Sequence, residues 1–282
     1  MRTILITVLF SIITLFSCDK SNDVGNDPVK NDIGYLLSRW IEGRDTISFQ
    51  YDNNNRLAGL VNVSNTFNYR GIYENFQYNS RGELESYKYT FSGSSSILSN
   101  VHNFLYQNDT IIKTSVNLNA SYGDATKFVL SNDRIIETRL GAVSNGIILH
   151  SGFWDTTQYS YLGENIIKCS YRFLTNTYQP VDTFLYHNNF YNPYMLLEKH
   201  IWSLVAGPGK GVAFGESKNI PSTVTRATYN VVGTTLLSSG FFSSKVTAVE
   251  SAKENSLLPK VIKFLEDDGS ESIVQYFYKK QK

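Results

Sequence analysis

The chain has little charge, few cysteines and few helix-forming residues. Of its 282 residues only 18% are charged, and it contains 2 cysteines, 2 methionines and 6 prolines. Alanine is also sparse, and this shortage of helix formers excludes a helical bundle. The 26 basic and 25 acidic side chains leave a formal charge of +1, which gives no electrostatic case for a nucleic-acid partner.

Aromatic residues are abundant. Phe, Trp and Tyr make up 14% of the chain, with 19 tyrosines and 17 phenylalanines, and Asn and Ser are frequent. This content excludes disorder for most of the chain, because disordered segments are poor in aromatic residues. Aromatic residues favour strands, while Asn and Ser favour turns, so the composition predicts an all-β fold.

The N-terminus carries a short apolar segment. Arg2 is the only charged residue before Cys18, and residues 4–16 are mostly apolar. This run is shorter than the roughly 20 apolar residues of a transmembrane helix and has the length of a signal-peptide core. It ends in Leu15-Phe16-Ser17-Cys18, which resembles the signal of bacterial lipoproteins. An ordinary secretory signal that happens to contain a cysteine is the alternative.

The lipoprotein resemblance implies cleavage before Cys18 and acylation of that residue, detectable as palmitate. Residues 1–17 are then the signal peptide, residues 18–32 are the lipidated cysteine with a polar tether, and residues 33–282 form one domain. Cleavage removes one basic residue and no acidic one, so the mature chain has no net charge and its acyl chains must supply the membrane attachment. We expect a cell-envelope protein, anchored to the outer membrane and facing the periplasm or the exterior.

A short pattern recurs along the domain. Two large residues, separated by a single residue, precede a turn of Asn, Asp or Gly. An aliphatic residue lies six positions after the second of the two large residues. Alternation puts both large side chains on one face of a strand, and the turn starts a hairpin. The repeats predict a single large antiparallel meander curled into a barrel-like sheet. The expected cross-strand neighbours are Tyr51 and Leu57, Tyr78 and Leu84, Tyr106 and Ile112, Leu130 and Ile136, and Tyr161 and Ile167.

Further motifs occur in a fixed order along the chain. The lipobox and the Tyr-turn-Leu hairpins are followed by Asn192-Pro193-Tyr194, residues 217–221, Leu258-Pro259-Lys260 and Tyr276-x-Tyr278, the last two in an expected final hairpin. Together they resemble a domain of unknown function in bacterial lipoproteins whose fold is described as porin-like. The resemblance implies a porin-like barrel and no assigned activity. Tyr51-Asp52 with Arg56-Leu57 also resembles one unit of the tyrosine–aspartate repeats of bacterial shell-forming toxins, with Asn55 replacing the usual glycine.

Residues 193–221 interrupt the hairpin period. Pro193 suits a helix start and Gly207 a helix end, so one short helix is expected near 194–205, covering or plugging the sheet, followed by a Gly-rich loop. Trp202 and Lys210 are the candidate ligand-binding residues, the first for stacking on a sugar or capping a pocket and the second for an anionic group. Packing of Trp202 onto the sheet is the alternative.

Catalytic and metal-binding motifs do not stand out. The 4 histidines lack partners at metal-ligand spacing, so no metal is expected and no catalytic residue is assigned. Residues 207–211 lack the spacing and the Ser or Thr of a phosphate loop, and no cofactor is expected. After lipidation of Cys18, Cys169 has no disulfide partner and is interpreted as a buried apolar residue. Three Asp-Thr pairs resemble an O-glycosylation signal, with Thr46, Thr110 and Thr156 as candidates.

The leading functional hypothesis is a non-catalytic envelope lipoprotein that binds a glycan or protein ligand, or acts structurally. A hydrolase of envelope or dietary glycans and an integral outer-membrane barrel are the alternatives, so enzymatic activity is left open. Convergent carboxylates in a cavity favour the hydrolase, and a cavity of Tyr, Asn and aliphatic residues favours binding. Lys113, Ser115 and Asn117 share one face of their strand. If that face is the outer face of the barrel, it excludes a membrane-embedded barrel. If it faces the lumen, it does not.

Overall fold

The computed structural model describes residues 34–93, 97–118, 122–145, 147–173, 178–207, 210–230, 236–239, 244–253, 256–266 and 268–281, with the backbone alone for 150–154, 210, 230, 236–239 and 244. Cys18, the signal peptide and the tether lie outside these residues. The elements are β1 (Tyr35–Glu42), β2 (Asp45–Tyr51), β3 (Leu57–Ser64), β4 (Tyr69–Tyr78), β5 (Leu84–Ser92), β6 (Ile97–Gln107), β7 (Thr110–Asn117), β8 (Tyr122–Ser131), β9 (Arg134–Ser144), β10 (Ile147–Leu162), β11 (Asn165–Arg172), β12 (Tyr178–Tyr191), η1 (Pro193–Leu196), α2 (Ile201–Ala206), α3 (Lys210–Glu216), β13 (Asn219–Asn230), β14 (Leu236–Ser239), β15 (Ser244–Ser251), β16 (Pro259–Leu265) and β17 (Glu271–Lys280).

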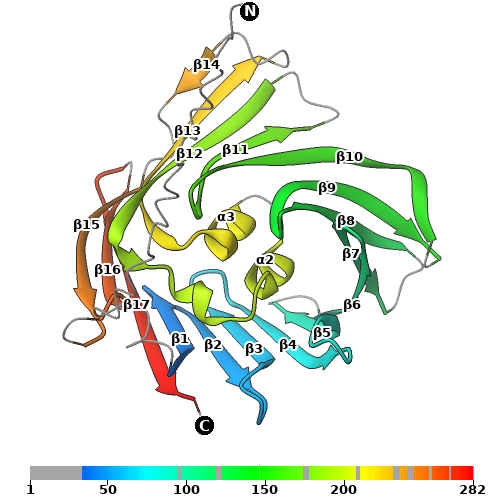
Figure 1. Ribbon diagram of the computed structural model, residues 1–282, viewed down its shortest axis with the longest axis horizontal. Coiled ribbons are helices and arrows are strands. Elements are labelled where there is room, and N and C mark those ends of the chain that lie inside the picture. The colour runs from blue at the N-terminus through cyan, green and yellow to red at the C-terminus, as the bar shows by residue number, and fades with distance from the viewer. Residues whose placement is uncertain are drawn as a thin grey trace, which may run out of the picture.

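The strands form one closed antiparallel sheet. Each strand from β1 to β13 pairs with the next along the chain, β13 pairs with both β14 and β15, and β15 to β17 continue the meander. β17 then pairs with β1, which closes the ring. In Figure 1 this ring surrounds the helices. The predicted fold, an all-β meander curled into a barrel, is confirmed.

The repeated hairpins are present, but their register differs in part from the prediction. Tyr51 lies opposite Leu57 and Tyr78 opposite Leu84, as expected. In the other three hairpins the partner is one residue earlier, so the predicted partners Ile112, Ile136 and Ile167 were wrong. The observed pairs are Tyr106 with Ile111, Leu130 with Ile135, and Tyr161 with Ile166.

Turn length explains the difference in register. In the first two hairpins an Asp or Asn side chain opens a longer loop: Asp52 Oδ1 accepts from the Arg56 backbone N–H at 2.9 Å, and Asn79 Oδ1 accepts from that of Glu83 at 3.0 Å. In the other three, two residues connect the strands, with positive φ at Asn108, Asn132 and Gly163. Such tight turns bring the earlier aliphatic residue to the inner face.

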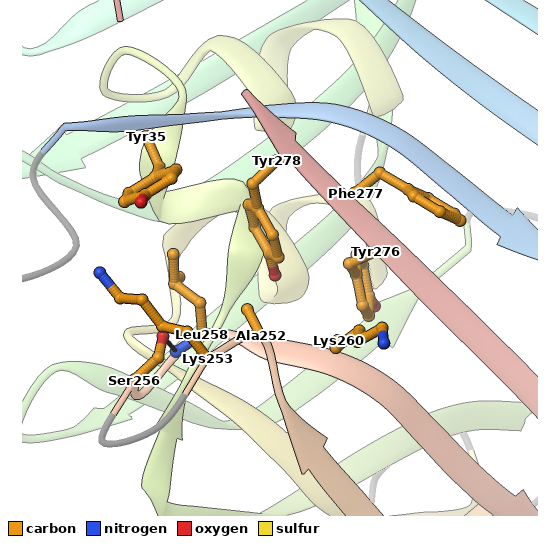
Figure 2. Close-up of a pocket in the computed structure, with 9 residues that line it drawn as sticks. All are labelled: Tyr35, Ala252, Lys253, Ser256, Leu258, Lys260, Tyr276, Phe277 and Tyr278. Carbon is orange, nitrogen blue, oxygen red and sulfur yellow. Dashed lines mark hydrogen bonds between the residues drawn. The ribbon is translucent and has the colours of Figure 1, made fainter. Parts of the chain in front are cut away.

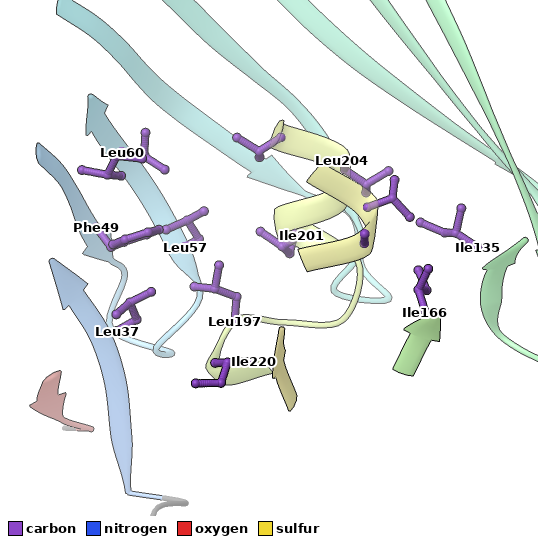
Figure 3. Packing of buried hydrophobic residues seen from close by; sticks show 14 of the residues in the cluster. Leu37, Phe49, Leu57, Leu60, Ile135, Ile166, Leu197, Ile201, Leu204 and Ile220 are labelled. Carbon is purple, nitrogen blue, oxygen red and sulfur yellow. The ribbon is translucent and has the colours of Figure 1, made fainter. Parts of the chain in front are cut away.

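The core of the molecule lies inside the ring. Leu57, Leu84, Ile135 and Ile166, the inward partners in four of the hairpins, are all fully buried. Figure 3 shows Leu57, Ile135 and Ile166 around the helical insertion, which contributes Leu197, Ile201 and Leu204. Cys169 also belongs to this core, which confirms its interpretation as a buried residue. The apolar faces of the strands and helices therefore pack against one another in the interior.

The insertion that follows β12 differs from the single helix predicted. Pro193 and Gly207 mark its expected start and end, with Gly207 at a φ of 84°. However, the helix is divided into η1 and α2, because Leu197 is extended and His200 adopts a φ of 63°. The segment predicted as a Gly-rich loop contains α3, and β13 begins at Asn219, inside the stretch 193–221 that was expected to lie outside the hairpins. The two α-helices bury Leu204 and Val212 completely or nearly so.

Lys113, Ser115 and Asn117 point into the ring. Their cross-strand partners are Phe104, His102 and Asn100 on β6, and Phe104 and His102 are buried. The Lys113 ammonium donates to the Leu204 carbonyl at 2.8 Å, near the end of α2. A cation there complements the partial negative charge of a helix C-terminus, while burial lowers the pKa of Lys113 to about 8.

The outer faces of other strands carry charged side chains. Glu74 on β4 and Lys88 on β5 are direct cross-strand partners with their charged atoms 3.3 Å apart, and both are partly exposed. On β9, Glu137 and Arg139 form another ion pair. Within the described ranges, helices long and apolar enough to span a membrane are not found.

Candidate functional site

Hydrogen bonds from Asn192 fix the two ends of the insertion. The Asn192 side chain accepts from the Tyr194 backbone N–H at 3.1 Å, which caps η1. Its amide donates to the carbonyl of Phe214 within α3 and to that of Ser217 just after α3. Because Asn192 is only 2% exposed, these bonds are shielded from water. Asn192 thus joins the start and the end of the insertion through its side chain.

The structure places the predicted residue Trp202 in a stack of rings. Trp202 lies parallel to Tyr194, with centroids 4.2 Å apart and planes 12° apart. On another side its centroid is 6.1 Å from that of Phe49 in the core. Trp202 is partly buried and does not line the cavities given below, whereas its neighbour Tyr194 does. The other predicted residue, Lys210, begins α3, and its side chain lies outside the described atoms.

A cavity of about 230 Å³ lies between the insertion and the inner faces of β1, β13, β16 and β17, and we call it the aromatic cavity. Its walls combine rings with aliphatic side chains and two carboxylates. The lining residues are Trp40, Glu42, Asn192, Tyr194, Phe214, Ile220, Pro221, Val224, Ile262, Phe264, Glu266, Val274 and Tyr276.

Strand topology brings the two carboxylates of the aromatic cavity together. Glu42 ends β1, and Glu266 follows the end of β16. β17 lies between these strands and runs antiparallel to both, so β1 and β16 end at the same rim of the ring. Burial raises the pKa of Glu42, and the negative charges of Glu266 and Asp45 raise it further. The negative charge of each carboxylate therefore acts on the other.

The side-chain carboxylate of Glu42 lacks a hydrogen-bond or ion-pair partner among the described residues. Glu266 accepts from the Ser272 hydroxyl at 2.7 Å, and Asp45 from the Ser64 hydroxyl at 2.8 Å. None of the lining residues of the aromatic cavity is Lys, Arg or His. The negative charge in this cavity is therefore not neutralised by a basic group in its wall.

A second cavity, of about 250 Å³, shares Tyr276 with the aromatic cavity and has the opposite charge. Figure 2 shows its two lysines, Lys253 and Lys260, together with the rings of Tyr35 and Tyr278. The Lys253 ammonium lies 4.6 Å from the centroid of the Tyr35 ring. We call this the lysine cavity.

The largest of these cavities, about 560 Å³, lies beside the start of α2. Glu198 lines it, and its Oε2 atom is buried without a hydrogen-bond partner in the part of the chain that is described. The His200 ring contacts the Glu216 carboxylate at 2.8 Å, and the Ser203 hydroxyl donates to the same carboxylate at 2.6 Å. Both the hydroxyl and the imidazole are thus bonded to Glu216, which fixes α2 to α3.

The three candidate glycosylation residues lie on strands and are half-buried. Thr46 and Thr156 occupy the outward positions of β2 and β10, and Thr110 starts β7 with its hydroxyl donating to the Gln107 carbonyl at 2.8 Å. Their modification stays a prediction. Groups of three or more side chains able to hold a metal ion are not found in the described ranges.

Sequence reasoning found the insertion but not the acidic residues of the aromatic cavity. Tyr194 and Tyr276 belong to sequence motifs that carry no assigned role, and no motif marks Glu42 or Glu266. Each of these acids precedes a turn, where solvated carboxylates are ordinary. Only the pairing of β17 with β1 shows that they share a cavity.

Comparisons with known proteins identify similar structures but no sequence relatives. Neither the family models nor the curated proteins include a match to this chain. A crystal structure of a porin-like protein from Bacteroides uniformis ATCC 8492 has a TM-score of 0.40 at 11% identity, and covers 86% of this chain and 98% of its own. A second, from Bacteroides vulgatus ATCC 8482, has a TM-score of 0.40 at 10% identity with the same coverage. Both carry the porin-like description expected from the sequence.

Proposed function

We propose that this protein is a lipid-anchored, non-catalytic binding protein of the cell envelope. The observation that carries the proposal is the filled ring: the apolar core and the helical insertion occupy the interior, and the small aromatic cavity remains beside the insertion. A rigid sheet that positions an irregular insertion is a common way to build a binding site. The Leu15-Phe16-Ser17-Cys18 signal supplies the anchor in this proposal.

The outer surface supports a tethered domain over an integral barrel. A membrane-embedded barrel needs an apolar band on its outer face, and Lys or Arg at its midplane costs about 2–4 kcal/mol each. Here Lys88, Arg139 and Lys168 lie at outward positions within strands. These three basic side chains lie outside the ring, which is the arrangement expected for a domain surrounded by water.

A hydrolase is the second candidate function, because Glu42 and Glu266 share one cavity. Paired carboxylates with different proton affinities are the usual machinery of glycoside hydrolysis. The test is turnover of envelope polysaccharides by the purified protein, with Glu42→Gln and Glu266→Gln as variants. Turnover that both substitutions abolish would establish the hydrolase and contradict the binding proposal.

Attachment is tested by Cys18→Ser in the full-length chain. We expect the wild-type protein to fractionate with membranes and to incorporate labelled palmitate, because two or more acyl chains anchor a protein stably. The variant should lose the label and leave the membrane fraction. The measurement is fractionation with metabolic labelling.

Cys169→Ser is the matched control, since Cys169 is buried in the core and should not affect labelling. If the Cys18 variant keeps both the label and the membrane association, the lipoprotein proposal is wrong.

A further inference from the structure

We propose that the aromatic cavity binds an organic cation, an ammonium group carried by a small ligand. The inference rests on the proposed function, because it assigns a ligand class to a cavity of a binding protein. It combines three observations, namely rings on several walls, carboxylates without a basic partner, and an unpaired hydroxyl.

The rings come from separate elements and surround one space. Trp40 lies on β1, Tyr276 on β17, Phe264 on β16 and Tyr194 on η1, and all four line the cavity. Aromatic faces attract cations through their quadrupoles, most strongly for Trp, and several rings together form a cage for ammonium groups. A volume of about 230 Å³ suits a small head group rather than a large ligand.

The negative charge of the aromatic cavity favours a positively charged ligand. Glu42 and Glu266 line it, and the lining residues include no basic side chain. Two carboxylates in one partly dehydrated space repel each other. Burial raises the pKa of Glu42 first, and the negative charge of Glu266 raises it further. A bound cation would relieve the repulsion, whereas an anion would add to it. The neighbouring lysine cavity has the opposite preference.

The ring positions are fixed before a ligand enters. Tyr194 is held by its stack on Trp202, and Tyr276 is itself buried in the core of the ring. The Tyr194 hydroxyl itself has no hydrogen-bond partner among the described residues. Tyr194 and Glu42 line the same cavity. This hydroxyl is available to a polar group of the ligand.

The test compares choline with 3,3-dimethylbutan-1-ol, which has the same shape and no charge. Both are titrated into the full-length protein in detergent while tryptophan fluorescence is recorded, since Trp40 lines the cavity, and by calorimetry. We expect saturable binding of choline, and at least tenfold weaker binding of the neutral alcohol. Equal affinity for the two probes, or no saturation by choline, would overturn the proposal.

Variants locate the site. Glu42→Gln and Glu266→Gln should each weaken choline binding at least fivefold, and Lys253→Gln in the lysine cavity should leave it unchanged. Thermal melts check that each variant is folded, and the two-probe comparison on the wild-type protein holds even if one variant is not. Unchanged affinity in both folded acid variants would place the cation elsewhere and contradict the proposal. If choline fails to bind while attachment still depends on Cys18, the ligand class is wrong and the envelope-binding function stands.

Discussion

Trp202 connects the core of the ring to the wall of the aromatic cavity. One side of its indole faces Phe49 on β2, and another stacks on Tyr194 of η1. Tyr194 in turn lines the cavity. The sequence hypothesis placed Trp202 against a ligand, and the alternative placed it against the sheet. The contacts favour the packing role, with an indirect effect on the cavity through Tyr194.

Trp202→Ala should therefore destabilise the protein. We expect a loss of about 3 kcal/mol in the free energy of unfolding, at the lower end for truncating a large aromatic residue because the indole is only partly buried. Chemical denaturation monitored by circular dichroism measures the change. Trp202→Phe, which keeps a ring on Tyr194, should recover part of the loss. An unchanged denaturation midpoint in the alanine variant would show that the ring is not a packing residue.

At the scale of single elements, the turns determine which side chains reach the core. The two longer turns have the same backbone pattern, since the Asn55 N–H donates to the Asp52 carbonyl at 3.1 Å and the Gly82 N–H to the Asn79 carbonyl at 3.0 Å. The residue at this position has a positive φ in both, 62° at Asn55 and 81° at Gly82. Glycine adopts this conformation without strain, and Asn tolerates it better than most residues.

Substitutions at Asn55 and Gly82 should change the stability of the protein in opposite directions. Gly82→Ala should cost about 1 kcal/mol, and because a Cβ there would meet nothing within 4 Å, the cost is one of backbone conformation. Asn55→Gly should leave stability unchanged or raise it by a few tenths of a kcal/mol. Urea denaturation measures both.

Gly34→Ala is the control for these turns, since Gly34 also has open space around it but lacks a positive φ. A Gly82→Ala variant as stable as the Gly34→Ala variant would contradict the turn assignment.

At the scale of the whole molecule, the ring is closed by residues from both ends of the domain. β17 lies between β16 and β1, and its inward residues Val274 and Tyr276 are buried. Most pairings are between consecutive strands and form locally. The pairing of β1 with β17 joins residues such as Tyr35 and Lys280, so it carries a large loop-closure cost.

Removal of residues 271–282 should thus open the ring and expose the core. We expect loss of the cooperative thermal transition and rapid proteolysis, because β1 and β16 both lose a neighbour. A shorter truncation, of residues 281–282, removes one backbone hydrogen bond between Gln281 and Gly34 and should melt within a few degrees of the wild type. A cooperative transition in the longer truncation would mean that closure is dispensable for the fold.

The sequence by itself determined the class of fold, the hairpins and the position of the insertion, because these depend on local physics. Alternating large residues and turn-forming Asn, Asp and Gly act within about ten residues, which suffices for a strand or a turn. The uniform six-residue spacing gave the direct partner only in the hairpins with the longer turn, which is why Leu57 and Leu84 were correct and Ile112 was not. The division of the helix at His200 depends on packing and was missed.

Tertiary structure alone decided the composition of the cavities. Glu42 and Glu266 are far apart in the chain and have no local pattern that marks them. They become neighbours because β17 returns to β1, and their cavity exists because η1 and α3 fold back against the inner face of the sheet. Long-range closure of this kind depends on the summed packing of many strands, so no short stretch of sequence encodes it.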